Sequence, residues 1–397
     1  QLMDQKTVRV QRQFSIKSHS HEIGIWSNDN TIEVEWHPPS TKKGLRGFLH
    51  VWDQMSETSL WDNITLDEFQ RTLTSNPLED GSSHYFHLNA IDKNNNLKTT
   101  SHLGPFLIDV VPPPPPSSLK SSSHQVGVWT ALNKVAVDWV DNQDETSGLL
   151  GYSILWNQQP ISTPPETINI GNAVTEFVTP QLTDGQWYAH LRSTDAAENW
   201  SIDTVHLGPF LIDTKLPKLP SGLHSTSHQT NEWSNLNQIS LSWNAEPNQQ
   251  SGISSYLILW DQLPSSIPNE QSYQHKQTTY TSPVLADGEN YFVHIRSIKK
   301  AGLISANTLH LGPFHIDTVE PEPAWDLAIY RPPDTTKKLD ITKWQNKPGF
   351  SLVWKHKNTQ EISSYSIKRK YLEQKFPTMN VEGTQLALSN LDDGTWL

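Results

Sequence analysis

Cysteine is missing from all 397 residues of the chain, which excludes disulfides, cysteine nucleophiles and thiolate ligands for a metal. No apolar run approaches the about 18 residues that a membrane-spanning helix requires, so no such segment is expected. Basic side chains are in deficit, because 30 Lys and Arg face 42 Asp and Glu and leave a formal net charge of -12. Since nucleic acids are bound by clusters of Lys and Arg, no nucleic-acid partner is expected.

Motifs of common enzymes are absent as well. The sequence holds no Gly-rich phosphate loop, no G-x-S-x-G elbow and no His-Glu-x-x-His zinc motif. It shows no hydrophobic signal segment and begins with Gln1 rather than Met, so we expect a processed chain or a fragment. The sequence therefore predicts neither an enzyme nor a cofactor.

What the sequence does contain is an internal repeat of about 104 residues. The string His-Leu-Gly-Pro-Phe-x-Ile-Asp begins at His102, at His206 and at His310. A Trp that closes an alternating run and an Asp-Gly pair recur at a similar interval, and both occur in a fourth, shorter copy. They are Trp36, Trp139, Trp243 and Trp354, and Asp80-Gly81, Asp184-Gly185, Asp287-Gly288 and Asp393-Gly394.

Within each copy apolar and polar residues alternate, which is typical of strands with one buried face. Residues 135–139 and 239–243 alternate in this way, and further strands are expected at 152–156, 175–179 and 187–193. Short strands at this density, without an amphipathic helix, predict an all-β fold of tandem β-sandwiches. Pro-rich stretches after each copy are expected to form short, semi-rigid linkers.

The copies resemble fibronectin type III modules. In the second copy the likeness is carried by Val137-x-Trp139 at a strand end, by Tyr152-x-Ile154 in the next strand, and by the Leu-x-Asp-Gly corner at 182–187. The Gly-Pro-Phe-x-Ile-Asp strand with its Pro linker is similar to arrays in large bacterial secreted or surface proteins, which implies immunoglobulin-like sandwiches outside the cell. Two departures stand out: there is no Arg-Gly-Asp, so integrin binding is not implied, and the fourth copy has Arg369 where the others have Trp.

The repeat predicts the division of the chain. We expect an N-terminal extension at 1–13, β-sandwich repeats at 14–111, 112–216 and 217–319, and a partial repeat at 320–397 that lacks its last two strands. Two explanations stay open for this end: the natural protein continues, or a neighbouring subunit donates a strand, for which the alternating run at 7–12 is suited.

Histidines recur at two positions of each copy, first at His87, His190 and His294 and again at His102, His206 and His310. A reaction site needs to occur only once, whereas a structural residue recurs in every copy. Hydrogen bonding between strands is therefore the favoured interpretation, and zinc binding, which needs three or four converging ligands, is the alternative.

Carboxylates raise the question of calcium. Asp109, Asp213 and Asp317 stand at the exits of the repeats, where they are candidates for ordering a turn or for binding calcium between domains. A second acidic group, Asp141, Asp144 and Glu145, lies in one loop and does not recur in the third copy, so a solvated loop is favoured there. We expect no metal site, with calcium at the exit aspartates as the alternative.

Two sets of residues are candidates for ligand or partner contact. Trp61 and Trp200 fall in loops, lack repeat partners and offer rings on which a sugar stacks. Strand alternation directs a second set out of the core, at Tyr188, His190 and Arg192 and, in the third copy, at Phe292, His294 and Arg296. This second set forms either a lateral contact face or a surface that the segment 157–174 covers.

Together these features predict a non-catalytic, extracellular or cell-surface structural protein: a spacer, a stalk, or a component of a filament or surface layer. Its expected partners are other copies of itself or other surface proteins. The alternative is an accessory, carbohydrate-binding or adhesive region of a large secreted hydrolase or adhesin, with glycans as partners.

Overall fold

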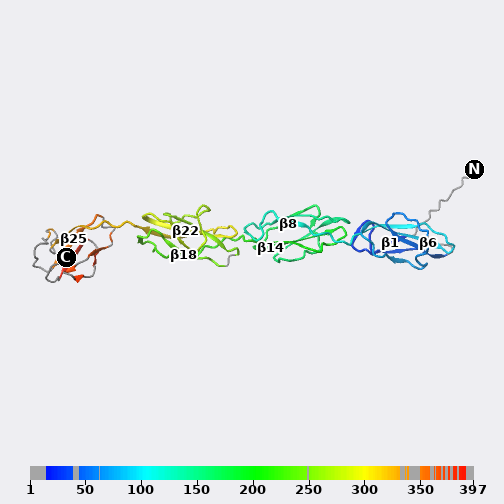
Figure 1. The fold of residues 1–397 in the computed structure, drawn as a ribbon, viewed down its shortest axis with the longest axis horizontal. Coiled ribbons are helices and arrows are strands. Elements are labelled where there is room, and N and C mark those ends of the chain that lie inside the picture. Colours follow the sequence, from blue (N-terminus) through cyan, green and yellow to red (C-terminus); the bar gives the residue numbers. More distant parts are fainter. Residues whose placement is uncertain are drawn as a thin grey trace, which may run out of the picture.

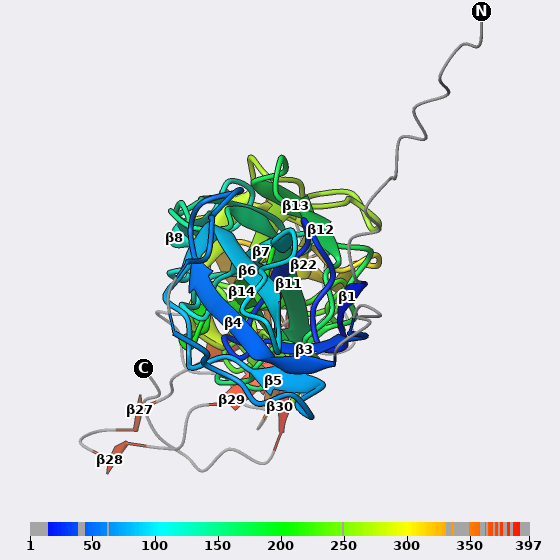
Figure 2. The same ribbon diagram turned by 90° about the vertical axis from the view of Figure 1, so that its right-hand side faces the viewer.

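The computed structural model describes residues 15–38, 44–61, 63–247 and 250–330, and further residues of the last part, namely 336, 338, 349–357, 362, 364–367, 370–371, 374–375, 379–381 and 384–389. All regular structure in these residues is β-strand. The strands form a row of units joined end to end (Figure 1), and a view along the row superposes them (Figure 2). The expected N-terminal extension, Arg369 and the end of the chain at 390–397 lie outside the described residues.

The first unit, module 1, is built from two sheets of orders β1-β3-β5 and β2-β7-β6-β4. Neighbouring strands are antiparallel except that β2 runs parallel to β7. The strands are β1 Ile16–Ser18, β2 Trp26–Ser27, β3 Glu33–Trp36, β4 Leu45–Asp53, β5 Thr72–Thr74, β6 Gly81–Asp92 and β7 Ser101–Ile108.

Modules 2 and 3 repeat this plan and add one short edge strand to the larger sheet. Module 2 has sheets β13-β10-β8 and β12-β11-β14-β15-β9, and module 3 has β16-β18-β21 and β17-β23-β22-β19-β20. The strands of module 2 are β8 Ser117–Ser121, β9 Trp129–Thr130, β10 Ala136–Val140, β11 Leu149–Asn157, β12 Ile170–Gly171, β13 Glu176–Val178, β14 Gly185–Asp195 and β15 Val205–Ile212. Those of module 3 are β16 Ser221–Ser225, β17 Trp233–Ser234, β18 Ser240–Asn244, β19 Ile253–Asp261, β20 Tyr273–His275, β21 Thr279–Thr281, β22 Gly288–Lys299 and β23 Leu309–Ile316.

Each of these modules encloses its own hydrophobic core, as the alternating sequence predicts. In module 2 Val137 and Trp139 of β10 face Ile154 of β11 and Leu191 of β14, and all four side chains are buried. The ring of Trp139 meets that of Tyr152 edge to face at 5.3 Å. Modules 1 and 3 contain equivalent clusters around Trp36 and Trp243. The cores are separate, so a core defect in one module leaves the others packed.

The Gly-Pro of the repeated string has a steric reason. Gly208 has a φ of +146°, and a Cβ there would lie 2.8 Å from the carbonyl oxygen of Trp187 and 2.7 Å from a ring carbon of Tyr188. Gly104 and Gly312 meet equivalent neighbours at similar φ. The last strand therefore lies so close to the preceding one that only glycine fits.

Module 4 is described in part. Its strands β24 Trp325–Tyr330, β25 Gly349–Lys355 and β30 Gln385–Ser389 form an antiparallel sheet. Trp354 is buried and meets Tyr365 of β26 Tyr365–Ile367 edge to face, in the way Trp139 meets Tyr152. The described remainder consists of β29 Met379–Val381, paired with β26, and the pair β27 Lys370–Tyr371 and β28 Gln374–Lys375.

Candidate functional site at the module junctions

The aspartate that ends each repeated string orders the chain as it leaves the module. The Oδ1 atoms of Asp109, Asp213 and Asp317 accept hydrogen bonds from the backbone N–H two residues later, at 3.1, 3.3 and 3.1 Å. This is the turn role that the sequence favoured for all three. Their surroundings differ, because Asp109 and Asp213 are fully buried whereas Asp317 is exposed.

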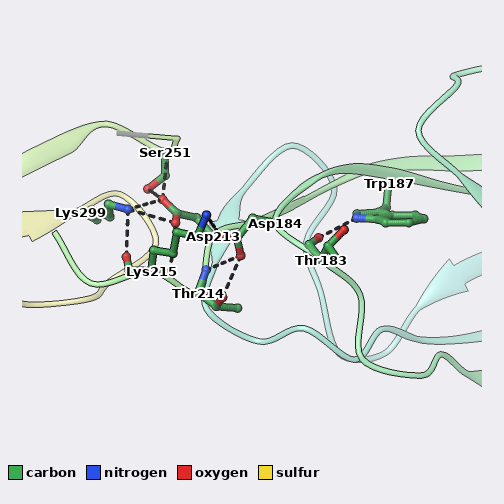
Figure 3. A network of polar contacts seen from close by, with 8 residues as sticks. All are labelled: Thr183, Asp184, Trp187, Asp213, Thr214, Lys215, Ser251 and Lys299. Atoms are coloured by element: carbon green, nitrogen blue, oxygen red, sulfur yellow. Dashed lines mark hydrogen bonds and ion pairs between the residues drawn. The ribbon is translucent and has the colours of Figure 1, made fainter. Parts of the chain in front are cut away.

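A buried ion pair closes the junction between modules 2 and 3. Lys299, the last residue of β22, places Nζ 2.9 Å from Oδ2 and 3.0 Å from Oδ1 of Asp213 (Figure 3). The ammonium also donates to the carbonyl oxygen of Lys215 at 2.9 Å. Ser251 donates to Asp213 Oδ2 through its N–H at 2.9 Å and its hydroxyl at 2.6 Å. One carboxylate of module 2 is thus held by two residues of module 3.

Charge is balanced at this junction. Burial acts to raise the pKa of Asp213, but hydrogen bonds from Ser251 and Lys299, together with the ammonium charge, outweigh burial and lower the pKa. Asp213 is therefore ionised at neutral pH. Lys299 is 4% exposed, so the pair is shielded from solvent and salt.

The junction between modules 1 and 2 gathers three carboxylates instead. Asp109 of module 1, Asp144 of the loop before β11 and Asp195 at the end of β14 each place an oxygen within 4.8 Å of the others. Among the described residues this is the only such convergence of acidic or histidine side chains. Asp109 and Asp195 are fully buried and Asp144 partly so. The cluster joins two modules, because its members come from both.

Backbone N–H groups and the side-chain amide of Asn199 hold the three carboxylates in place. Asp144 Oδ1 accepts the N–H groups of Thr146, Ser147 and Gly148 at 3.1, 2.9 and 2.9 Å. The N–H of Ser147 also lies 3.1 Å from Asp109 Oδ2. Asp195 accepts three hydrogen bonds within its own turn, two of them from Asn199. Burial raises the pKa of Asp195, the bonds from Asn199 oppose this, and the charges of Asp109 and Asp144 add to the rise.

The two junctions are variants of one arrangement. Asp195 pairs with Leu149, and Lys299 pairs with Ile253, at the same point of the larger sheet in successive modules. Position 195 of module 2 therefore corresponds to position 299 of module 3. No sequence pattern singles out either residue, because Lys299 lies 86 residues along the chain from the aspartate that it contacts, and Asp195 is equally distant from Asp109.

The recurring histidines form pairs, each with one buried and one exposed ring. His190 is fully buried, and its Nδ1 lies 2.7 Å from Nδ1 of His206 on β15. Its Nε2 lies 3.0 Å from Oδ1 of Asn157 at the end of β11. The predicted hydrogen bonding between strands is confirmed in all three modules. The other pairs are His87 with His102 and His294 with His310, whose buried members face Asp53 and Asp261.

The side chains that strand alternation directs out of the core do not form an open face. His190 is buried and Arg192 is only 9% exposed. Arg192 lies 3.9 Å from Glu166 of the segment 157–174, donates to the carbonyl oxygen of Ser201 and stands over the Trp200 ring. In module 3 His294 is buried, and Arg296 donates to backbone carbonyls of Pro268 and Ser305. Tyr188 and Phe292 are half-buried beside them. The contact-face interpretation is therefore wrong for these histidines and arginines. In module 2 the contact from Glu166 to Arg192 agrees with the favoured alternative, in which the segment 157–174 covers this face.

The two loop tryptophans differ in their surroundings. Trp61 is 82% exposed. Trp200 is half-buried and lines a pocket of about 220 Å³ together with Glu166, Ile168 and Glu198. The bridge from Thr194 to Trp200 has a counterpart from Ile298 to Ile304, so Trp200 occupies a position that carries an aliphatic residue in module 3.

No model of a known protein family matches the chain, and no curated protein matches it significantly. In the part of the chain that the structure describes, no helix has the length and apolar character needed to cross a membrane. The junctions and the exposed side chains are therefore the features from which a function can be inferred.

Proposed function

We propose that this protein is a non-catalytic spacer or stalk outside the cell, built from tandem modules of the fibronectin type III kind. The observation that carries the proposal is the Asp213–Lys299 pair, which ties one module to the next through buried hydrogen bonds. A surface contact between freely moving domains would not need such a buried pair. The module type is supported by the paired sheets and by the buried Trp that is the last residue of β3 and the penultimate residue of β10 and β18.

The extracellular location follows from the resemblance of the repeat to arrays in bacterial secreted and surface proteins. The proposed partners are other copies of the chain or other surface proteins, at its ends or along its length.

Small-angle scattering of the full chain tests the spacer proposal. The longest strands have 12 residues, so each module is about 40 Å long and four in a row measure about 160 Å. A rod of that length has a radius of gyration of about 45 Å, against about 21 Å for a compact globule of this size. We expect the larger value, and a value near the smaller one would overturn the proposal.

A carbohydrate-binding or adhesive role is a second candidate, favoured by Trp61, whose ring is exposed on module 1. Exposed aromatic rings provide stacking surfaces for sugars. Glycan-array binding that is lost in Trp61→Ala would support this role. Phe69→Ala is the matched control, because Phe69 is 78% exposed on the same module.

A further inference from the structure

The carboxylates between modules 1 and 2 gather buried negative charge that no cationic side chain of the described residues balances. Asp109 and Asp195 are both fully buried. Among the described residues no lysine, arginine or histidine forms an ion pair with either of them or with Asp144. Burying charge without a partner of opposite sign is strongly unfavourable, so buried carboxylates are paired or coordinate metals.

The next junction shows which kind of partner this position takes. There the residue equivalent to Asp195 is Lys299, and its ammonium lies within 3.0 Å of both oxygens of the exit aspartate Asp213. A cation therefore sits beside the buried exit aspartate, delivered by the end of the long strand. In module 2 the same strand end places a carboxylate there instead of an ammonium. The exit aspartate therefore has another oxygen ligand beside it and no cation from the chain.

A buried hydroxyl gives an independent indication. The Oγ of Ser147 is buried and has no hydrogen-bond partner, whereas its equivalent Ser251 donates to Asp213 at 2.6 Å. The backbone N–H of Ser147 is 3.1 Å from Asp109, so this residue belongs to the junction. The same N–H lies 2.9 Å from Asp144 Oδ1, so the residue with the unpartnered buried hydroxyl contacts two of the three carboxylates through its backbone.

We propose that Asp109, Asp144 and Asp195 bind one calcium ion between modules 1 and 2. All three are hard oxygen donors, which suit Ca²⁺ and Mg²⁺ rather than zinc. Oxygens on opposite sides of a Ca²⁺ ion lie about 4.6–5.2 Å apart, against about 4.0–4.2 Å for Mg²⁺. Carboxylate oxygens within 4.8 Å of one another therefore reach one Ca²⁺ without closing further.

The site needs both modules, because Asp109 belongs to module 1 and the other two ligands belong to module 2. Calcium then fixes the first junction in the way that the Lys299 ammonium fixes the second. This inference does not depend on where the protein is located or on the second candidate function. It replaces the sequence-based preference for a solvated loop at Asp144, since that side chain turns toward the junction.

Calorimetric titration of the full chain with CaCl₂ tests the site. We expect one Ca²⁺ per chain, with a dissociation constant of about a millimolar or tighter. Asp144→Asn should weaken binding by about tenfold or more. Asp141→Asn is the matched control, because Asp141 is exposed in the same loop, carries the same charge and should leave binding unchanged.

Asp195→Lys is the sharper variant, because it copies the second junction. This variant should not bind calcium. Hydrogen exchange of the amides at 144–148 should then be the same with and without EDTA, because calcium no longer stabilises the junction. Asp195→Asn, which keeps an oxygen acceptor for its turn, tests the same loss of binding should the lysine variant misfold.

The proposal is overturned if the wild-type chain gives no binding signal in millimolar CaCl₂, if Asp144→Asn binds as tightly as Asp141→Asn, or if Asp195→Asn binds as tightly as the wild type. Equal affinity for MgCl₂ would overturn the assignment to calcium. A rod-like scattering profile with no calcium binding would refute this inference alone and leave the spacer proposal standing.

Discussion

Replacing Lys299 by Met tests the structural role of the second junction. The change keeps most of the aliphatic stem and removes the ammonium that contacts Asp213 and the carbonyl oxygen of Lys215. Asp213 is then fully buried with the donors of Ser251 but no cation. Breaking a buried ion pair by removing one partner costs about 3–5 kcal/mol. The junction avoids the cost of an unpaired buried charge by opening, because water then reaches the Asp213 carboxylate.

We therefore expect local opening at the junction while module 3 stays folded, since its core contains neither Lys299 nor Asp213. Hydrogen exchange followed by mass spectrometry measures this directly. Amides in peptides that cover Asp213 and Ser251 should exchange faster by about two to four orders of magnitude, the equivalent of about 3–5 kcal/mol. A peptide around Phe314 in the core serves as the internal control.

Adding Asp213→Asn to the variant should recover most of the lost protection, because no buried charge then lacks a partner. The reasoning fails if the single variant leaves exchange at the junction unchanged. It fails equally if the core peptide loses as much protection as the junction peptides, because the pair would then stabilise module 3 itself.

Three further changes probe single modules. Trp139→Ala should cost about 3–5 kcal/mol and remove the melting transition of module 2 while leaving the others, seen by calorimetry. Burial lowers the pKa of His190 in the folded protein below the 6.5 of the unfolded chain. The neutral His190 therefore stabilises module 2 fully above pH 6.5, and this stability is lost as the pH falls, because the unfolded chain binds a proton at His190 more readily. Asn157→Asp should reduce this acid sensitivity in thermal melts at about pH 7.5 and about pH 5, because modules 1 and 3 have a carboxylate at that position. Gly208→Ala should destabilise module 2 by more than about 1 kcal/mol in urea, whereas Gly171→Ala, with open space around its Cβ, should not.

Much of each module could be predicted from the sequence, because the alternation of apolar and polar residues that defines its strands and core is a local pattern. Alternation places Val137 and Trp139 in the core, and the structure puts both there. The expected strand at 175–179 is β13 at Glu176–Val178, and the strand expected at 187–193 lies within β14. Comparison between copies identified the paired histidines as structural, because a residue that recurs in every module is expected to support the fold that all modules share.

Alternation did not reveal what covers a side chain once it leaves the core. His190 and Arg192 point away from the core of module 2. The segment after β11, however, turns back, pairs with β11 through β12 and brings Glu166 to Arg192. Gly151 permits this close approach, because a Cβ there would lie 2.6 Å from the carbonyl oxygen of Ile170. Such a long loop has no period of its own, so its path depends on contacts that a pattern of polar and apolar residues does not encode.

The junctions escaped prediction for a different reason, and that reason bears on how the array works. Comparison between copies singles out what recurs, whereas Asp195 and Lys299 matter because they differ at equivalent positions. In a linear array each module contacts only its neighbours, so the stiffness of the whole is set junction by junction. One residue at the end of the long strand decides whether the exit aspartate meets an ammonium of the next module or joins a set of carboxylates. A single substitution there changes what holds one joint and leaves the cores untouched. The proposed calcium site would thus give an array of modules with one common fold two kinds of joint, one that responds to calcium and one that does not.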